Sequence, residues 1–142
     1  MTIARLIEGR GSEVIGCETG TSVREAVALF ASHKIGAVPV LENGEIVGIF
    51  SERDVVRHLA EQGPGMLDGS VGAVMTAPAI TVEPGTGVMD ALGLMTRRRF
   101  RHLPVVAGGR MVGFVSIGDL VKYRIERIEA EAEAMRSYIQ SA

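Results

Sequence analysis

The amino-acid sequence predicts an α/β fold made of two β-α-β-β-α repeats related by a pseudo-twofold axis, with an extended C-terminal helix. Residue n matches residue n+65 without a gap over most of the chain, which indicates an internal duplication. Each copy also has the same order of strand-period and helix-period apolar patterns, with a glycine turn between two strands. One such unit has too little core to be stable alone, whereas two can bury their sheets together. The matching pairs include Gly20/Gly85, Thr21/Thr86, Val23/Val88, Ala26/Ala91, Leu29/Leu94, Pro39/Pro104, Val40/Val105, Gly44/Gly109, Val47/Val112, Gly48/Gly113, Ser51/Ser116, Asp54/Asp119 and Val56/Val121.

Residues 1–13 form a leader ahead of the repeats. Ile3, Leu6 and Ile7 fall on one face of a predicted helix over residues 3–8, which the glycines at positions 9 and 11 would end. We expect this helix to dock onto the core.

The first repeat spans residues 14–62. We expect a short strand at 14–17 and a helix from 23 to about 33, introduced by the capping-box pair Ser22 and Glu25. A strand at 37–41, the turn Asn43-Gly44 and a returning strand at 45–50 predict a hairpin. A helix then runs from Ser51 to about residue 62.

The second repeat spans residues 77–124 and follows a linker over 63–76, in which Gly63-Pro64-Gly65 precedes a short helix at 71–75. Its predicted elements are a strand at 79–82, a helix from 86 or 87 to about 98, strands at 102–106 and 111–115, and a helix from Ser116. Residues 125–142 are predicted to extend that last helix.

Composition limits the class of protein. The chain has 142 residues, 46% hydrophobic, and a formal net charge of −2, which is typical of a globular chain with one good core. Cys17 is the only cysteine, so no intrachain disulfide can form, and the apolar residues before it predict a buried thiol. Neither a signal peptide nor a membrane-spanning run is present, so we expect a cytoplasmic protein without a membrane partner. The near-neutral charge argues against nucleic-acid binding.

The pattern S-x-x-D follows an apolar strand twice, ending at Asp54 and at Asp119. Ser51 and Ser116 stand where the following helices begin. Helix N-termini bind anions because their first N–H groups have no partner within the helix. A carboxylate three residues later can accept both hydroxyls of a ribose. The pattern therefore predicts a phosphate-and-ribose site; alternatively, each acid only caps its own helix, as in a capping box.

Three motifs, each present in both copies, resemble the cystathionine-β-synthase (CBS) domain, and the pair resembles a Bateman module, from about residue 14 to about residue 124. The motifs are a T-x-V-x-E/D-A helix start, an h-P-V strand and the stretch G-h-h-S-x-x-D. The first two are carried by Thr21, Val23, Glu25 and Ala26 with Thr86, Val88, Asp90 and Ala91, and by Val38-Pro39-Val40 with Leu103-Pro104-Val105.

The resemblance implies an α/β fold that binds adenosine-containing ligands such as AMP, ATP, NAD(H) or S-adenosylmethionine. By position, Asp54 and Asp119 would hold the ribose, and Ser51 and Ser116 would help to bind phosphate. Thr81, just ahead of the second helix, would also touch the ligand. Backbone at the two strand entrances would face adenine or phosphate; the residues there are Gly36, Ala37, Pro39, Arg101, His102 and Pro104.

The two clefts are predicted to differ, because Gly36-Ala37 aligns with Arg101-His102. Arginines beside a phosphate-binding helix start favour a di- or triphosphate, or the pyrophosphate of a dinucleotide. Arg53 adds another cation next to Asp54. The preceding arginines of the run at 97–99 fit a second interpretation, in which they complement the C-terminus of their own helix.

Catalytic and metal-binding patterns are not evident: we find no nucleophile with a paired base and no cluster with metal-ligand spacing. The resemblance supplies no catalytic residue either. We therefore interpret the chain as a binding module, not an enzyme, that senses an adenine nucleotide, with AMP or NAD(H) first, and transmits its ligand state to an unidentified protein. Two alternatives stay open, namely a structural interaction module that binds no nucleotide and an enzyme with an unrecognised site.

Apolar residues of the last helix recur with the spacing 4-3-4-3-4, which indicates a heptad seam. The seam can fold back onto its own core, but its length favours a partner chain. Because modules of the resembled family commonly pair, we predict a homodimer. The seam residues are Val121, Ile125, Ile128, Ala132, Met135 and Ile139.

Overall fold

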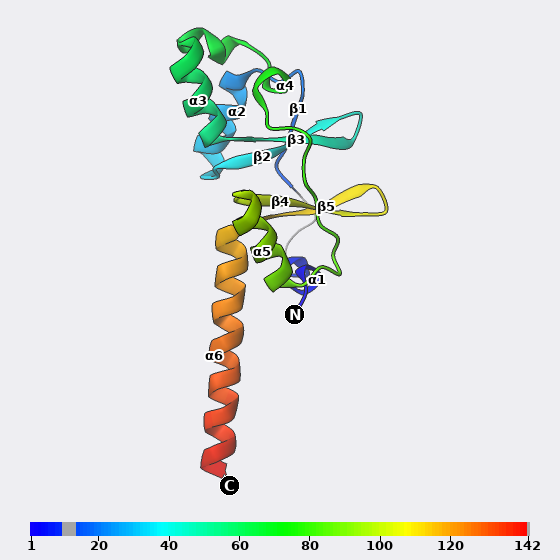
Figure 1. The fold of residues 1–142 in the computed structure, drawn as a ribbon, viewed down its shortest axis with the longest axis vertical. Coiled ribbons are helices and arrows are strands. Elements are labelled where there is room, and N and C mark those ends of the chain that lie inside the picture. The colour runs from blue at the N-terminus through cyan, green and yellow to red at the C-terminus, as the bar shows by residue number, and fades with distance from the viewer. Residues whose placement is uncertain (10–13, 142) are drawn as a thin grey trace.

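The computed structural model describes residues 1–9 and 14–141 and has the predicted α/β fold. Figure 1 shows the two repeats stacked one above the other, with α6 leaving the body. The first repeat consists of β1 (Cys17–Glu18), α2 (Val23–His33), β2 (Ala37–Glu42), β3 (Glu45–Ser51) and α3 (Glu52–Gln62). The link consists of η1 (Pro64–Asp68) and α4 (Val71–Val74), and the second repeat of α5 (Val88–Arg98), β4 (His102–Ala107), β5 (Arg110–Ser116) and α6 (Ile117–Ser141); α1 (Ile3–Ile7) precedes both.

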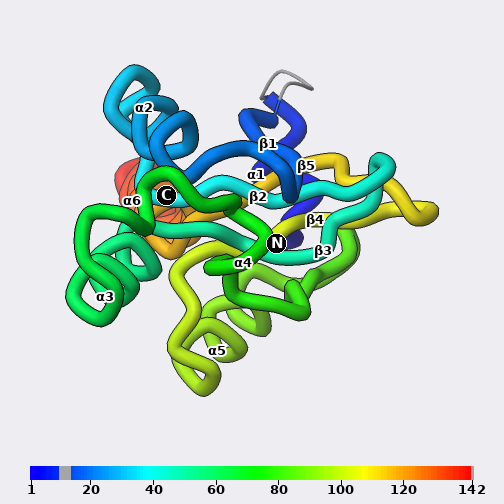
Figure 2. The backbone as a smooth tube through the Cα atoms, turned by 90° about the horizontal axis from the view of Figure 1, so that it is seen from above, coloured from blue at the N-terminus to red at the C-terminus, as the bar shows by residue number. Residues whose placement is uncertain are grey.

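The two hairpins have the same register, as expected of a duplication. Strand β2 pairs antiparallel with β3, and β4 with β5, and both hairpins shift register at the equivalent step. Ala37 faces Ser51 in the first hairpin, and His102 faces Ser116 in the second. Figure 2 shows the hairpins side by side with their turns pointing the same way. Each hairpin therefore delivers its serine directly to the start of a helix.

Two apolar clusters form the interior, one in each repeat. Phe30 and Phe50 stack at 5.7 Å between ring centroids in the first cluster. Helix α1 docks onto the second cluster, where Ile3 is fully buried. Backbone bonds hold it there, with Ile3 N donating to Thr86 O at 2.9 Å and Ala4 N to Pro84 O at 2.8 Å. The leader thus packs as expected, and it completes the core of the second repeat.

The strand predicted at residues 79–82 is wrong. Only Val82 makes a bridge, parallel to Val105, while Thr76 bridges Ile49 of the first repeat. The segment crosses from one hairpin to the other, so only its two ends pair, and its prolines at 78 and 84 offer no N–H donor. The first strand is likewise shorter than expected, β1 being limited to Cys17–Glu18.

Helix α6 has 25 residues and is anchored by Leu120, which is fully buried. Its seam is not folded back onto the body: every seam residue is exposed in the described structure. The seam residues therefore form an apolar surface that is not covered by the described part of the chain. Among the described residues, no helix is both long and apolar enough to cross a bilayer.

The docking of α1 can be tested with Ile3→Ala. Removing this fully buried side chain should lower the free energy of unfolding by about 2–4 kcal/mol, because it leaves a cavity in the second core. Urea unfolding followed by circular dichroism measures the change. The matched control is Arg5→Ala, an exposed position of the same helix, which should stay within about 0.5 kcal/mol of the parent. Equal effects of the two substitutions would contradict the docking.

Candidate functional site

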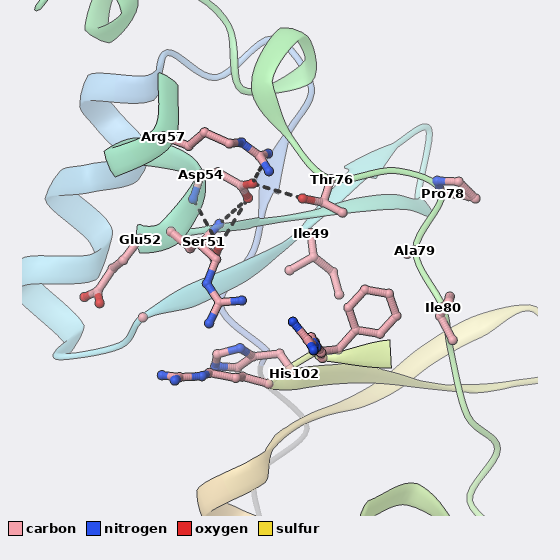
Figure 3. Close-up of a pocket in the computed structure, with 15 residues that line it drawn as sticks. Ile49, Ser51, Glu52, Asp54, Arg57, Thr76, Pro78, Ala79, Ile80 and His102 are labelled. Atoms are coloured by element: carbon pink, nitrogen blue, oxygen red, sulfur yellow. Dashed lines mark hydrogen bonds and ion pairs between the residues drawn. The ribbon is translucent and has the colours of Figure 1, made fainter. Parts of the chain in front are cut away.

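A cavity of about 350 Å³ lies between the two repeats (Figure 3). It is formed by the junction of β3 with α3, by the crossing segment 76–80, and by the turn that precedes β4. Its volume falls at the small end of the range of about 300–1,000 Å³ that is typical of small-molecule sites. The lining residues are Gly36, Ile49, Ser51, Glu52, Arg53, Asp54, Arg57, Thr76, Pro78, Ala79, Ile80, Arg99, Phe100, Arg101 and His102.

The junction of β3 with α3 is a capping box. Ser51 is the last residue of β3 and the N-cap of α3; its Oγ accepts from Asp54 N at 3.4 Å, and its own N–H donates to Asp54 Oδ2 at 3.0 Å. The second repeat shows the same geometry: Ser116 Oγ accepts from Asp119 N at 3.0 Å, and Ser116 N–H donates to Asp119 Oδ2 at 2.8 Å. The capping interpretation of S-x-x-D is therefore correct as local structure. In the first repeat the cap also places the positive end of α3 at the cavity.

Asp54 connects α3 to the crossing segment. Its side chain is almost fully buried, and Oδ1 accepts from Arg57 Nη2 and from Thr76 Oγ1, both at 3.0 Å. The backbone of Thr76 is in turn paired with Ile49 of β3 through two bonds of 2.9 Å. Asp54 Oδ2 also accepts from Ser51 Oγ at 3.2 Å. A ribose hydroxyl at Asp54 would therefore compete with Arg57, Thr76 or Ser51 for the carboxylate oxygens.

Positive charge dominates the cavity. Four arginines line it, namely Arg53, Arg57, Arg99 and Arg101, against two acidic residues, Glu52 and Asp54. All four arginines are exposed, so they can adjust to a ligand, although Arg57 is held by Asp54. Arg53 and Arg57 come from the first repeat, and Arg99 and Arg101 come from the second. The arrangement suits an anionic ligand that spans both repeats, because guanidinium groups form strong charge-assisted bonds to phosphate oxygens.

His102 lines the cavity from the start of β4. Its ring stacks on Phe114 with centroids 5.5 Å apart and planes inclined by 12°. Burial lowers the pKa of His102 below its ordinary value of 6.5, and the nearby carboxylate of Asp119 only partly opposes this effect. The imidazole can therefore act as a hydrogen-bond donor and acceptor rather than as a further cation.

The cavity has a polar and an apolar side. In Figure 3, Pro78, Ala79 and Ile80 lie along one side of the cavity, and Ser51 and Glu52 along the other. Ile49 lies between them. An apolar wall facing clustered arginines is what a ligand with a flat aromatic end and a charged end requires.

Half of the predicted site residues line this cavity. The structure brings together Gly36, Ser51, Arg53, Asp54, Arg101 and His102. The others lie outside it for different reasons. Ala37, Pro39 and Pro104 are buried within strands, and Thr81 is exposed near the end of the crossing segment. Ser116 and Asp119 lie where the other hairpin leads into its helix, α6. Their roles as ligand contacts stay predictions.

The predicted site residues do not include the other lining residues, although Arg99 and Phe100 belong to the arginine-rich stretch 97–102 that the sequence singles out. Arg57 had a usable pattern, because a residue three positions after Asp54 lies on the same helix face. The duplication offered no pattern that would identify the crossing segment. Its residues 76–80 correspond to residues 11–15, of which 11–13 lie outside the described structure. The lining residues outside the predicted set are Ile49, Glu52, Arg57, Thr76, Pro78, Ala79, Ile80, Arg99 and Phe100.

The fold and the site together define a duplicated α/β protein with a ligand-sized cavity between its repeats. Family comparison gives the more specific assignment. The model of the CBS-domain family matches residues 11–61 and 71–126, one match for each repeat. The chain therefore belongs to the CBS-domain family.

Relatives are similar over nearly the whole chain. The mitochondrial CBS domain-containing protein CBSX3 of Arabidopsis thaliana is 36% identical over 148 residues, covering 98% of this chain and 72% of the relative. The crystal structure of the CBS-domain protein ATU1752 from Agrobacterium tumefaciens has a TM-score of 0.83 at 38% identity, covering 87% of this chain and 99% of that one. The crystal structure of CBSX2 in complex with AMP has a TM-score of 0.74 at 27% identity, covering 88% and 96%.

The link between Asp54 and the crossing segment can be tested with Thr76→Val. The substitution keeps the shape of the side chain but removes the hydroxyl donor from a buried carboxylate, which should cost about 1–2 kcal/mol of unfolding free energy. Urea unfolding measures it. Thr96→Val is the matched control, since the Thr96 hydroxyl only donates to Leu92 O on an exposed helix face. A loss at Thr76 no larger than at Thr96 would show that the contact with Asp54 contributes nothing.

The environment of His102 predicts a pH dependence. Because the folded pKa is lowered, the unfolded chain takes up this proton first. The stability associated with His102 is therefore complete above about pH 6.5 and is lost as the pH falls through the folded pKa. NMR titration of the ring protons, in native protein and in urea, measures both pKa values. A folded pKa equal to or above the unfolded one would contradict the buried, stacked arrangement.

Proposed function

We propose that the chain is a regulatory module whose inter-repeat cavity binds an adenine nucleotide, with AMP or NAD(H) as leading ligands. One observation carries the proposal: the N-terminus of α3, Asp54 and arginines from both repeats meet an apolar wall in one cavity. The complex of CBSX2 with AMP supports it, because that protein is similar over most of this chain.

Each part of a nucleotide has a matching group in the cavity. Phosphate would bind at the start of α3 and to Arg53 and Arg101, where charge-assisted bonds are available. Ribose hydroxyls would bond to Asp54 in exchange for its present partners. Adenine would pack against the apolar side formed by Pro78, Ala79 and Ile80, with Ile49 next to it. The small volume suits a mononucleotide or one half of a dinucleotide.

Binding would be transmitted through the crossing segment. Because Thr76 is held by both β3 and Asp54, a ligand that takes over Asp54 changes the balance between two positions of that segment. A ligand shifts such an equilibrium only by its difference in affinity for the two states. A partner protein, which includes a second copy of this chain in the homodimer we propose, would respond to the favoured state. We place this activity in the cytoplasm.

A non-binding interaction module is the second candidate. It is favoured by the capping boxes at Ser51 and Ser116, in which both acids already have a structural role. In that case nucleotides would leave the stability of the protein unchanged. An enzyme is disfavoured, since the Asp54 carboxylate that accepts from the Ser51 hydroxyl at 3.2 Å already serves as a helix cap and is bonded to Arg57 and Thr76 as well.

A thermal-melt screen against AMP, ADP, ATP, NAD⁺, NADH and S-adenosylmethionine distinguishes the nucleotide-binding module from the non-binding interaction module. A ligand at one hundred times its dissociation constant should stabilise the fold by about 2.7 kcal/mol, which is a shift of several degrees. Arg101 is an exposed lining residue. The substitution Arg101→Ala should lower the affinity for a phosphate-bearing ligand by about tenfold or more and leave the affinity for adenosine unchanged.

The control for that variant is Arg98→Ala, an exposed neighbour that does not line the cavity. It should keep the parent affinity in isothermal titration. If no nucleotide shifts the melting temperature, the interaction module replaces the sensor. If both arginine variants lose affinity equally, the ligand is held by diffuse charge and not in this cavity.

A further inference from the structure

Helix α6 presents an apolar face that no other part of the described chain covers. Figure 1 shows the reason, because beyond its first turns the helix leaves the body. An apolar stripe of this length on a free helix is a surface suited to another helix. The exposed fractions are 43% for Val121, 49% for Ile125, 48% for Ile128, 59% for Met135 and 64% for Ile139, and Ala132 is exposed as well.

The seam assigns each residue of α6 to a heptad position. Ile125, Ala132 and Ile139 occupy position a, and Val121, Ile128 and Met135 occupy position d. The positions that border the seam are then mostly charged. The charged residues are Arg124 and Glu131 at g, and Lys122, Glu129 and Arg136 at e; the remaining g position is Tyr138.

We infer that α6 pairs with α6 of a second copy as a parallel, in-register, two-stranded coiled coil. In that arrangement each g residue lies next to the e residue five positions later on the other helix. Arg124 then faces Glu129 of the second copy, and Glu131 faces Arg136 of the second copy. Twofold symmetry repeats both contacts, so opposite charges flank the seam on both sides.

The same charges disfavour the antiparallel arrangement. Reversing one helix so that the whole seam is covered places Ile128 beside Ala132 of the second copy. Glu129 then lies beside its own equivalent, as does Glu131, and Lys122 lies near Arg136 of the second copy. Like charges in these positions are destabilising. Charge complementarity therefore selects the parallel pairing.

The charged side chains are available for this role. Among the described residues, Arg124 and Glu129 take part in no ion pair within their own chain. Glu131 is 4.0 Å from Arg127, at the limit of an ion pair, and Arg136 pairs with Glu133 at 2.8 Å on an exposed face. Exposed pairs of that kind contribute little, so they are readily exchanged for contacts across the seam.

Parallel pairing has a structural consequence. A helix of 25 residues is roughly 37 Å long, and two of them in parallel hold both CBS bodies at the same end of a rod. The inference rests on the proposed homodimer and names its surface and orientation. It does not depend on nucleotide binding, so the two can fail separately.

Orientation is tested with Ala132→Cys. Parallel pairing places this position next to itself, so mild oxidation at pH 8 should give a disulfide-linked dimer of the full chain. The native thiol does not compete, since burial raises the pKa of Cys17 to about 11. An antiparallel pair would instead link Ala132→Cys only to Ile128→Cys in a mixture of the two variants. That result, or a failure to form any link, would overturn the inference.

Charge pairing is tested by sedimentation equilibrium. Glu129→Arg should raise the dissociation constant of the dimer about tenfold, because Arg124 would then face a like charge. The double variant Arg124→Glu/Glu129→Arg should restore it, and the control Glu126→Arg, at position b away from the seam, should leave it unchanged. A monomeric parent protein, or equal weakening by Glu129→Arg and Glu126→Arg, would overturn the inference. Isothermal titration with nucleotide on the same samples shows whether the cavity is intact.

Discussion

The carboxylate of Asp54 is the contact on which the arrangement of the site depends. It closes the N-terminus of α3, holds Arg57, and bonds to Thr76 of the segment that crosses to the second repeat. Gly48 permits this close approach, because an added Cβ there would lie 2.9 Å from the Thr76 carbonyl oxygen. A buried carboxylate needs such partners to remain charged at low energetic cost. One side chain thus connects helix cap, cavity and inter-repeat segment.

The two copies share their backbone structure but differ in the charged residues at the cavity. Both hairpins have one register and both helices one type of cap. The charged residues at the cavity are not repeated: Glu52-Arg53 corresponds to Ile117-Gly118, and Arg101-His102 to Gly36-Ala37. Because the cavity takes one wall from each copy, these differences concentrate cations in it. The pseudo-symmetry of the backbone therefore does not extend to the charged residues that line the cavity.

The two equivalent helices α3 and α6 differ for a local reason. Gly63 follows α3 with a φ of 76°, and Pro64 comes directly after it, so that helix ends. No proline or glycine interrupts the residues after Gly118, and α6 continues through Ser141. Val56 and Val121 occupy equivalent positions and both are exposed, at 67% and 43%. The seam therefore begins as a feature of the repeat and is extended only in the second copy.

The sequence by itself determined the repeat, the hairpins, the helix caps and the long final helix, because each depends on residues close together in the chain. It also identified the six lining residues that belong to the duplicated motifs or their strand entrances. Only the tertiary structure decided that residues 79–82 form no strand, that Thr76 and Ile80 line the cavity, and that the seam of α6 is uncovered. These features arise where segments from both repeats, distant in sequence, come together, and periodicity within one segment carries no information about its neighbours.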